Sequence, residues 1–118
     1  LKVRLVAHAR HRIKQARQHR GEDWNYIQAA DLILDPNILT IGFARRFSPY
    51  KRGDLLLRDA ERAMKIFSNP DRPVQIIFSG KAHPADEEGK RIIQRLMEWC
   101  KQPALWQRVA FIEDYDMY

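Results

Sequence analysis

The sequence has little of several features that would identify a protein class at once. It contains one cysteine, Cys100, so no disulfide can form within the chain. A lone cysteine favours a reducing compartment, and we expect a cytoplasmic protein. No apolar run approaches the about 18 residues that a membrane-spanning helix needs, and the basic N-terminal stretch lacks the apolar core of a signal peptide. We therefore predict no membrane partner.

Two glycine motifs and a metal-ligand pattern are also missing. The sequence has no G-x-G-x-x-G after a strand and no G-x-x-x-x-G-K-[ST]. A dinucleotide or nucleoside-triphosphate site is therefore unsupported. His8 and His11 are three residues apart, but no carboxylate or cysteine nearby completes a metal site, so we interpret them as solvated helix residues and predict no metal.

The positive charge is concentrated at one end of the chain. Residues 1–20 hold seven of the 21 basic residues and none of the 15 acidic ones, whereas the formal net charge of the whole chain is +6. The rest of the chain is therefore nearly neutral. This distribution weakens a nucleic-acid interpretation, which expects cations spread over a folded face, and we predict no nucleic-acid partner. A basic helix can still bind phosphates nonspecifically, so that alternative stays open.

Apolar periodicity predicts an α/β fold with three strands at 38–44, 74–78 and 109–112. Helices are expected from about Asp54 to Phe67, with Asp54 as N-cap, and from Pro84 to about Lys101. The order β-α-β-α-β predicts three buried parallel strands, half of a doubly wound sheet.

Residues 1–37 are expected to form a helical lead-in that packs on the domain at 38–118. Apolar residues recur at helical spacing over 1–19 and would leave Arg17 mostly on the surface. Asp23 is expected to cap a short helical turn. The apolar stretch 32–34 is either a docking segment or an edge strand.

Cations follow the first strand directly. In a parallel sheet the carboxyl ends of the strands share one edge, where phosphate-bearing ligands bind. That edge would carry residues from three loops: Arg45, Arg46 and Lys51; Gly80, Lys81 and His83; Glu113, Asp114 and Tyr115. An Arg and a Lys on either side of the Pro-Tyr turn could converge on one phosphate. A solvated basic loop is the competing interpretation.

Three sequence blocks at these strand ends carry a family resemblance. They are TIGFARRFSPYKR at 40–52, IFSGKAHP at 77–84 and FIEDYD at 111–116. In order, spacing and placement they resemble blocks of the α-glucan (glycogen, starch or maltodextrin) phosphorylases, most closely the bacterial branch. The animal pattern has Lys at the position of Arg45 and Ala at that of His83.

The resemblance implies a fragment of a larger glycosyltransferase of the GT-B architecture, from the opening half of its C-terminal Rossmann-like domain. Such enzymes transfer the terminal glucose of an α-1,4-glucan to inorganic phosphate and use pyridoxal 5′-phosphate, whose phosphate shuttles a proton. By motif position, Arg46 and Lys51 would hold the substrate phosphate as the catalytic pair. Arg45 would lie near the cofactor phosphate, and Tyr115 would line the cofactor pocket.

The resemblance further implies an allosteric, homodimeric parent, whereas the isolated chain is expected to be monomeric. The chain alone is expected to be inactive, because the family's Schiff-base lysine falls outside these 118 residues. Two alternatives stay open: another GT-B enzyme such as a glycogen synthase, and a small basic module that binds phosphates or nucleic acid.

Overall fold

The protein is a three-layer α/β unit, seen here in a computed structural model that describes residues 1–44, 58–82 and 84–113. Its elements are α1 (Lys2–His19), α2 (Trp24–Ala29), the 3₁₀ turn η1 (Ala30–Leu32), β1 (Leu39–Ala44), α3 (Ala60–Phe67), β2 (Val74–Gly80), α4 (Glu87–Trp99) and β3 (Val109–Glu113). The order confirms the expected β-α-β-α-β core behind an N-terminal helix.

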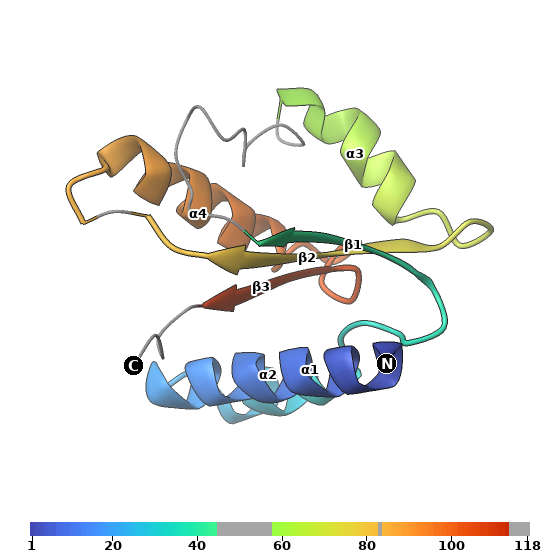
Figure 1. Cartoon of the computed structure of the whole chain (residues 1–118), viewed down its shortest axis with the longest axis horizontal. Coiled ribbons are helices and arrows are strands. Elements are labelled where there is room, and N and C mark those ends of the chain that lie inside the picture. The colour runs from blue at the N-terminus through green and yellow to red at the C-terminus, as the bar shows by residue number, and fades with distance from the viewer. Residues whose placement is uncertain (45–57, 83, 114–118) are drawn as a thin grey trace.

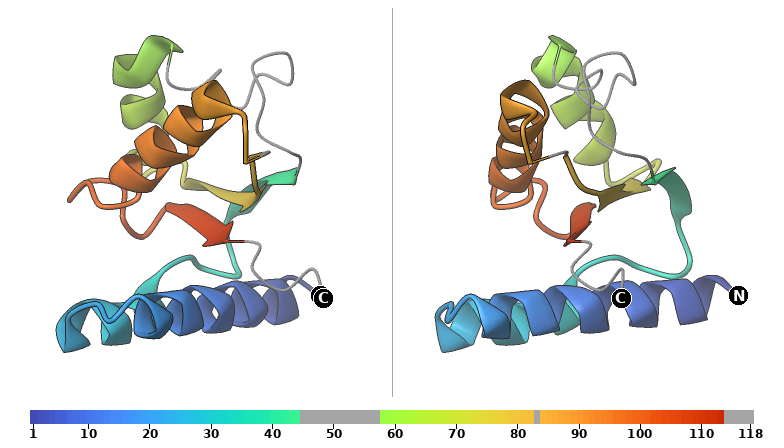
Figure 2. Two further views of the ribbon diagram at one scale, coloured as in Figure 1. Left: turned by 90° about the vertical axis from the view of Figure 1, so that its left-hand side faces the viewer. Right: turned by 60° about the vertical axis from the view of Figure 1, so that its left-hand side comes forward.

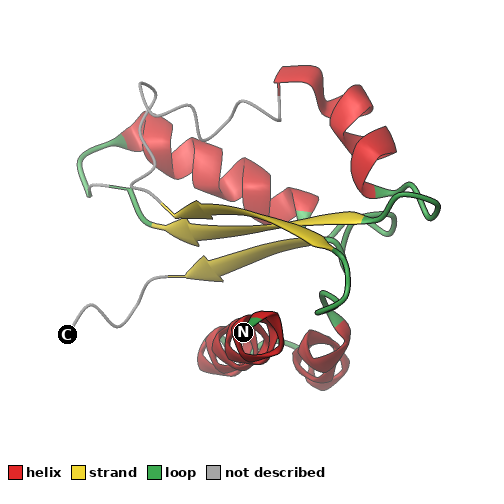
Figure 3. Ribbon diagram, turned by 45° about the vertical axis from the view of Figure 1, so that its right-hand side comes forward, coloured by secondary structure: helices red, strands yellow, loops and turns green. Residues whose placement is uncertain are grey.

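The sheet has the strand order β1-β2-β3, and both neighbouring pairs are parallel. Right-handed crossovers between consecutive strands place both connecting helices on the same face. Accordingly α3 and α4 cover one face, while α1, α2 and η1 cover the other (Figure 1). The view coloured by secondary structure shows the sheet between these two helical layers (Figure 3). This arrangement is consistent with half of a Rossmann-like domain.

Alternating residues of the central strand serve two separate cores. Ile76 and Phe78 pack with Phe67, Leu96 and Trp99 beneath α3 and α4. Residues between them, such as Ile77, point to the opposite face, because successive side chains of a strand alternate. There Ile77, Ala110 and Ile112 meet Val6, Ala9 and Ile13 of α1. The N-terminal helix is thus an integral layer of the fold, and in both views of Figure 2 it lies on the side of the sheet away from α3 and α4.

The first strand is at the edge, which corrects the prediction of a buried strand. Among the described residues, β1 pairs only with β2, and Leu39 and Ile41 are 62% and 45% exposed. The apolar composition of this strand by itself predicts burial on both faces. Burial of a strand also depends on a neighbour along its free side, which local composition does not report.

Both helix starts also differ from the prediction. The α-helical part of α3 begins at Ala60, and its N-cap is Asp59, whose carboxylate accepts the N–H of Arg62. The predicted cap, Asp54, lies outside the described residues. Helix α4 begins at Glu87, three residues after Pro84, and Asp86 caps it by accepting the N–H of Gly89. An aspartate bonded to the third residue of a helix satisfies an otherwise free donor, and this chemistry sets both starts.

Segment 32–34 is a docking segment, which resolves the alternative left open by the sequence. Its Ile33 and Leu34 are buried against α1 and do not pair as a strand. The Arg10 side chain donates to the carbonyl oxygens of both residues, at 2.7 and 2.8 Å. Leu34 adopts φ 63°, an uncommon conformation for a side chain of this size, and the Arg10 bonds hold it there. Asp23 caps α2 as expected.

Candidate functional site

The carboxyl ends of the three strands meet at one edge of the sheet. The register places Ala44 opposite Ser79, and Gly80 opposite Glu113. All three arrowheads point to the same side in Figure 1. The loops that follow the strands therefore start close together, as the sequence predicts.

The side chains predicted to act at this edge lie mostly outside the described residues. This holds for Arg45, Arg46 and Lys51 of the first loop, for His83 of the second, and for Asp114 and Tyr115 of the third. Their roles remain predictions. Of the remaining candidates, Lys81 is exposed, and Gly80 has φ 150°, a conformation that residues with a side chain rarely adopt. Gly80 therefore leaves the sheet edge without a side chain at this point.

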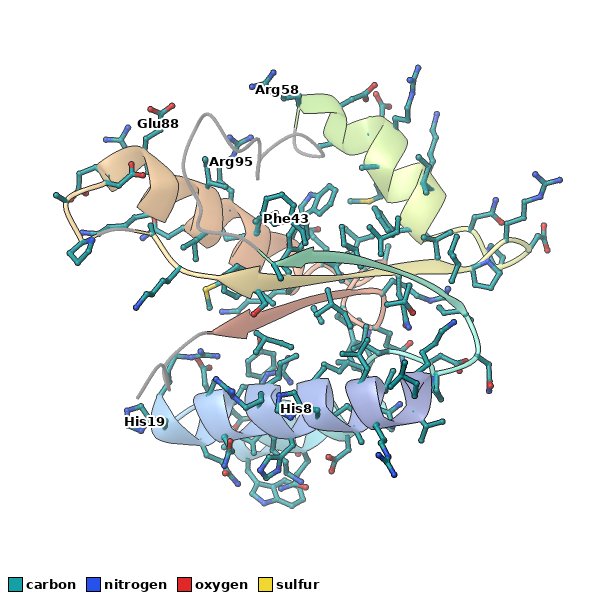
Figure 4. All side chains as sticks on the ribbon, in the orientation of Figure 1. His8, His19, Phe43, Arg58, Glu88 and Arg95 are labelled. Carbon is teal, nitrogen blue, oxygen red and sulfur yellow. The ribbon has the colours of Figure 1, made fainter. Side chains whose placement is uncertain are left out.

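The origin of the cationic loop is well anchored. Strand β1 pairs with β2 over six residues, and the ring of Phe43 lies 6.0 Å from that of Phe78. Phe43 points to the α3–α4 side (Figure 4), where it packs against the core. These contacts place Ala44, and hence the start of the loop, beside the end of β2.

The other end of β1 is held by a buried amide. Gln75 has no exposed surface, and its Oε1 accepts the N–H of Asp35 at 2.8 Å. Its Nε2 donates to the carbonyl of Asp35 and to Oγ1 of Thr40, both at 2.8 Å. The buried oxygen and nitrogen of the Gln75 amide are thus both hydrogen-bonded, to residues just before β1 and at its start.

Several cationic side chains of the basic helix α1 bind other segments of the fold. Lys14 pairs with Asp31 at 2.9 Å, and Lys2 donates to the carbonyl of Ile38. Together with the Arg10 bonds described above, these contacts tie α1 to the segment that leads into β1. The charge of this helix is therefore not simply a solvated face.

Arg17 is the clearest departure from the sequence prediction, which placed it mostly on the surface. Its side chain is buried, with Nη1 donating to the carbonyl of Tyr26 at 2.6 Å and the guanidinium 3.7 Å from the centre of the Tyr26 ring. Desolvation by burial lowers the pKa of Arg17. The signal that could have found it is spacing, because Arg17 follows Ile13 by four residues on the buried stripe.

A groove of about 910 Å³ lies between α1 and the face of the sheet that α1 covers. Leu5 and His8 of α1 line it on one side, and Thr40, Ile77 and Ile112 line it from the three strands. The sheet of a chain that is part of a larger domain is expected to leave an edge exposed, and β1 is at such an edge among the described residues.

Metal sites and membrane-spanning helices are both absent from the described residues. No group of three histidine, cysteine or acidic side chains in the described part of the chain is placed to hold a metal ion. Within those residues, no helix is long and apolar enough to cross a membrane.

Comparison with known proteins gives a consistent result. The chain is 50% identical over 115 residues to a glycogen phosphorylase of Aquifex aeolicus, a match that covers 98% of this chain and 17% of that protein. It is 40% identical over 117 residues to a glycogen phosphorylase of Mycobacterium tuberculosis, covering 99% of this chain and 14% of the relative. A maltodextrin phosphorylase of Thermococcus litoralis is 51% identical over 84 residues, or 71% of this chain and 10% of the relative.

The chain thus spans less than a fifth of the length of the curated relatives it matches. No family model matches it, and no solved structure matches it.

Proposed function

From the homology of this chain to a segment of the glycogen and maltodextrin phosphorylases, we propose that it is part of an α-glucan phosphorylase. Residues 38–118 would be the opening half of the C-terminal Rossmann-like domain of a GT-B enzyme, and residues 1–37 its helical lead-in. One observation carries this proposal: a 50% identical match over 98% of the chain to a named glycogen phosphorylase. The parallel register, which brings the carboxyl ends of the three strands to one edge of the sheet, supports it.

The substrate phosphate would be held by Arg46 and Lys51, the catalytic pair of the proposal. Their loop starts at Ala44, whose partner in the sheet is Ser79, next to Gly80. A guanidinium supplies two parallel donors to a phosphate, and an ammonium adds a point charge. Gly80 lets a phosphate approach the backbone of the second loop without meeting a side chain. Clustered cations of this kind stabilise charge that moves between two phosphates during glucosyl transfer.

Pyridoxal 5′-phosphate is the cofactor that the resemblance implies, and its phosphate would supply a proton shuttle when it is bound. Within this chain, Arg45 would neutralise that phosphate, and Tyr115 would line the pocket. The described residues of this edge fit an anion, since Gly80 carries no side chain and Lys81 is exposed. The attachment lysine would come from outside these residues, so we expect the isolated chain to be inactive. We also expect this chain to be monomeric. The parent would be a homodimer that acts on α-1,4-glucan and inorganic phosphate.

The alternative of a small basic binding module is disfavoured by one observation. It requires the cations of α1 to be available to a phosphate backbone. Instead, Arg10 and Arg17 donate to backbone carbonyls within the fold, and Lys14 pairs with Asp31. The other alternative, a glycogen synthase, shares the GT-B sheet, but the relatives described above are phosphorylases.

The first test is a ¹⁵N–¹H NMR titration of this chain with inorganic phosphate and then with pyridoxal phosphate, at low salt. We expect shifts at residues 45–53, at Gly80 and Lys81, and at Tyr115. Arg46→Gln should abolish the phosphate response, whereas Arg4→Gln, which changes an exposed cation of α1, should preserve it. Shifts confined to residues 1–20 would contradict the proposed site and favour the basic-module alternative.

A second test uses activity. We would replace the matching segment of the Aquifex aeolicus relative with this chain and measure release of glucose 1-phosphate from glycogen. An active chimera in which Arg46→Gln lowers kcat/KM for phosphate by about 10²-fold or more supports the assignment. A chimera that binds pyridoxal phosphate and is unaffected by Arg46→Gln would contradict the role of Arg46.

A further inference from the structure

A second pocket shares no lining residue with the groove between α1 and the sheet. It has a volume of about 420 Å³ and is formed by the end of α1, by α2, and by the residues that follow α4. This size is in the range of pockets that bury small organic ligands. The function proposed above does not use this pocket.

Its most unusual lining residue is Arg17. The residue is only 5% exposed, yet the contacts of its guanidinium in the described part of the chain are the carbonyl and the ring of Tyr26. The carboxylate of Glu22, which also lines the pocket, lies 3.4 Å from Nε of Arg20. A buried cation is costly when no carboxylate among the described residues pairs with it, and a stacked ring with one carbonyl compensates only part of that cost. The pocket therefore contains a cation that an anion would complement.

A second cation and two aromatic walls stand around the same space. Lys101 is exposed, and its Nζ lies 5.7 Å from the centre of the Tyr26 ring. Trp106 is partly buried and contributes an apolar wall. With Glu22 also present, the formal charge of these lining residues is one positive unit, which favours a singly charged anion over a dianion such as phosphate.

We propose that this pocket binds a planar aromatic monocarboxylate. Its carboxylate accepts hydrogen bonds from Arg17 and from Lys101 at the rim. Its ring packs against Trp106 and the edge of Tyr26. The proposal is independent of the phosphorylase assignment, because that assignment gives no role to any residue that lines this pocket.

The test is an NMR titration of the full 118-residue chain with benzoate, followed through the indole N–H of Trp106 and the amides of Ala29 and Lys101. Benzamide, the neutral analogue of the same shape, and inorganic phosphate serve as competing probes. We expect saturable shifts with benzoate, and binding of benzamide and phosphate at least about tenfold weaker, as loss of one charge-assisted hydrogen bond predicts.

Lys101→Met is the decisive variant, because Lys101 is exposed and its loss leaves the core intact. It should weaken benzoate binding by about tenfold and leave benzamide unchanged. Lys65→Met, which removes an exposed lysine of α3, is the matched control and should bind benzoate as the parent chain does. Arg17→Met should abolish benzoate binding, with circular dichroism to establish that the variant is folded.

Three results would overturn the proposal. They are no saturable benzoate shift up to about 10 mM, equal affinity for benzoate and benzamide, and equal affinity in the parent chain and Lys101→Met. Any of them would assign Arg17 a structural role alone, that of joining α1 to α2.

Discussion

The substitution Gln75→Leu tests most directly how the fold positions the strand that leads into the candidate site. Gln75 is fully buried in β2 and makes three hydrogen bonds to residues that precede and begin β1. Leucine has a similar volume, so the substitution removes these bonds without leaving a large cavity. The N–H of Asp35 would then lose its partner, and the Asp35 carbonyl would keep only the longer bond, 3.4 Å, from the N–H of Ile38.

The expected loss of stability follows from these contacts. Each hydrogen bond contributes about 1 kcal/mol net, or about 3 kcal/mol for the three. Burial of the added apolar surface of leucine stabilises the folded state by about 1 kcal/mol. We therefore expect the free energy of unfolding to fall by about 2 kcal/mol, and the midpoint of thermal unfolding to fall by about 8 °C in a domain of this size.

Urea unfolding followed by circular dichroism measures this change. Gln107→Leu is the matched control, since Gln107 is exposed and makes one longer bond, 3.3 Å, to the carbonyl of Leu32. The control should change stability by less than about 0.5 kcal/mol. Hydrogen exchange at the amide of Asp35 should accelerate in Gln75→Leu only. A loss below about 0.5 kcal/mol in Gln75→Leu would refute the reasoning, because β1 would then be held in place without this amide.

Three further outcomes are expected. Ala9→Glu should abolish cooperative unfolding, since Ala9 is fully buried between α1 and the sheet. Ala7→Glu, on the exposed side of α1, should unfold cooperatively. Equal stability of the two variants in urea would contradict the packing of α1. Asp86→Ala should cost about 1 kcal/mol in the same assay through loss of the α4 cap, and Asp71→Ala, which removes an exposed carboxylate outside any helix, should cost little. Burial raises the pKa of Cys100 to about 12 from 9.0, so the unfolded chain releases this proton first. This contribution to stability is complete below pH 9 and is lost as the pH rises towards 12, and Cys100→Ser should remove that part of the pH dependence in alkaline unfolding experiments.

Local chemistry explains what the sequence determined by itself. The order of strands and helices follows from apolar runs and from helical spacing, which are properties of neighbouring residues. The parallel pairing follows from the helices between the strands, and the meeting of the three strand ends at one edge follows from that pairing. The family resemblance also depends on contiguous blocks, and the relatives at 40–50% identity confirm it.

Tertiary structure decided the features that depend on contacts between distant segments. The exposure of β1 depends on the absence of a neighbour beyond it among the described residues, although its composition is that of a buried strand. The burial of Arg17 depends on Tyr26, and the full satisfaction of Gln75 depends on Asp35 and Thr40, 35 to 40 residues away. A sequence pattern predicts the face of a helix or strand on which a side chain lies. Only the folded chain determines which residues pack against that face, and therefore whether a charge there is solvated, paired within the protein or available to a ligand.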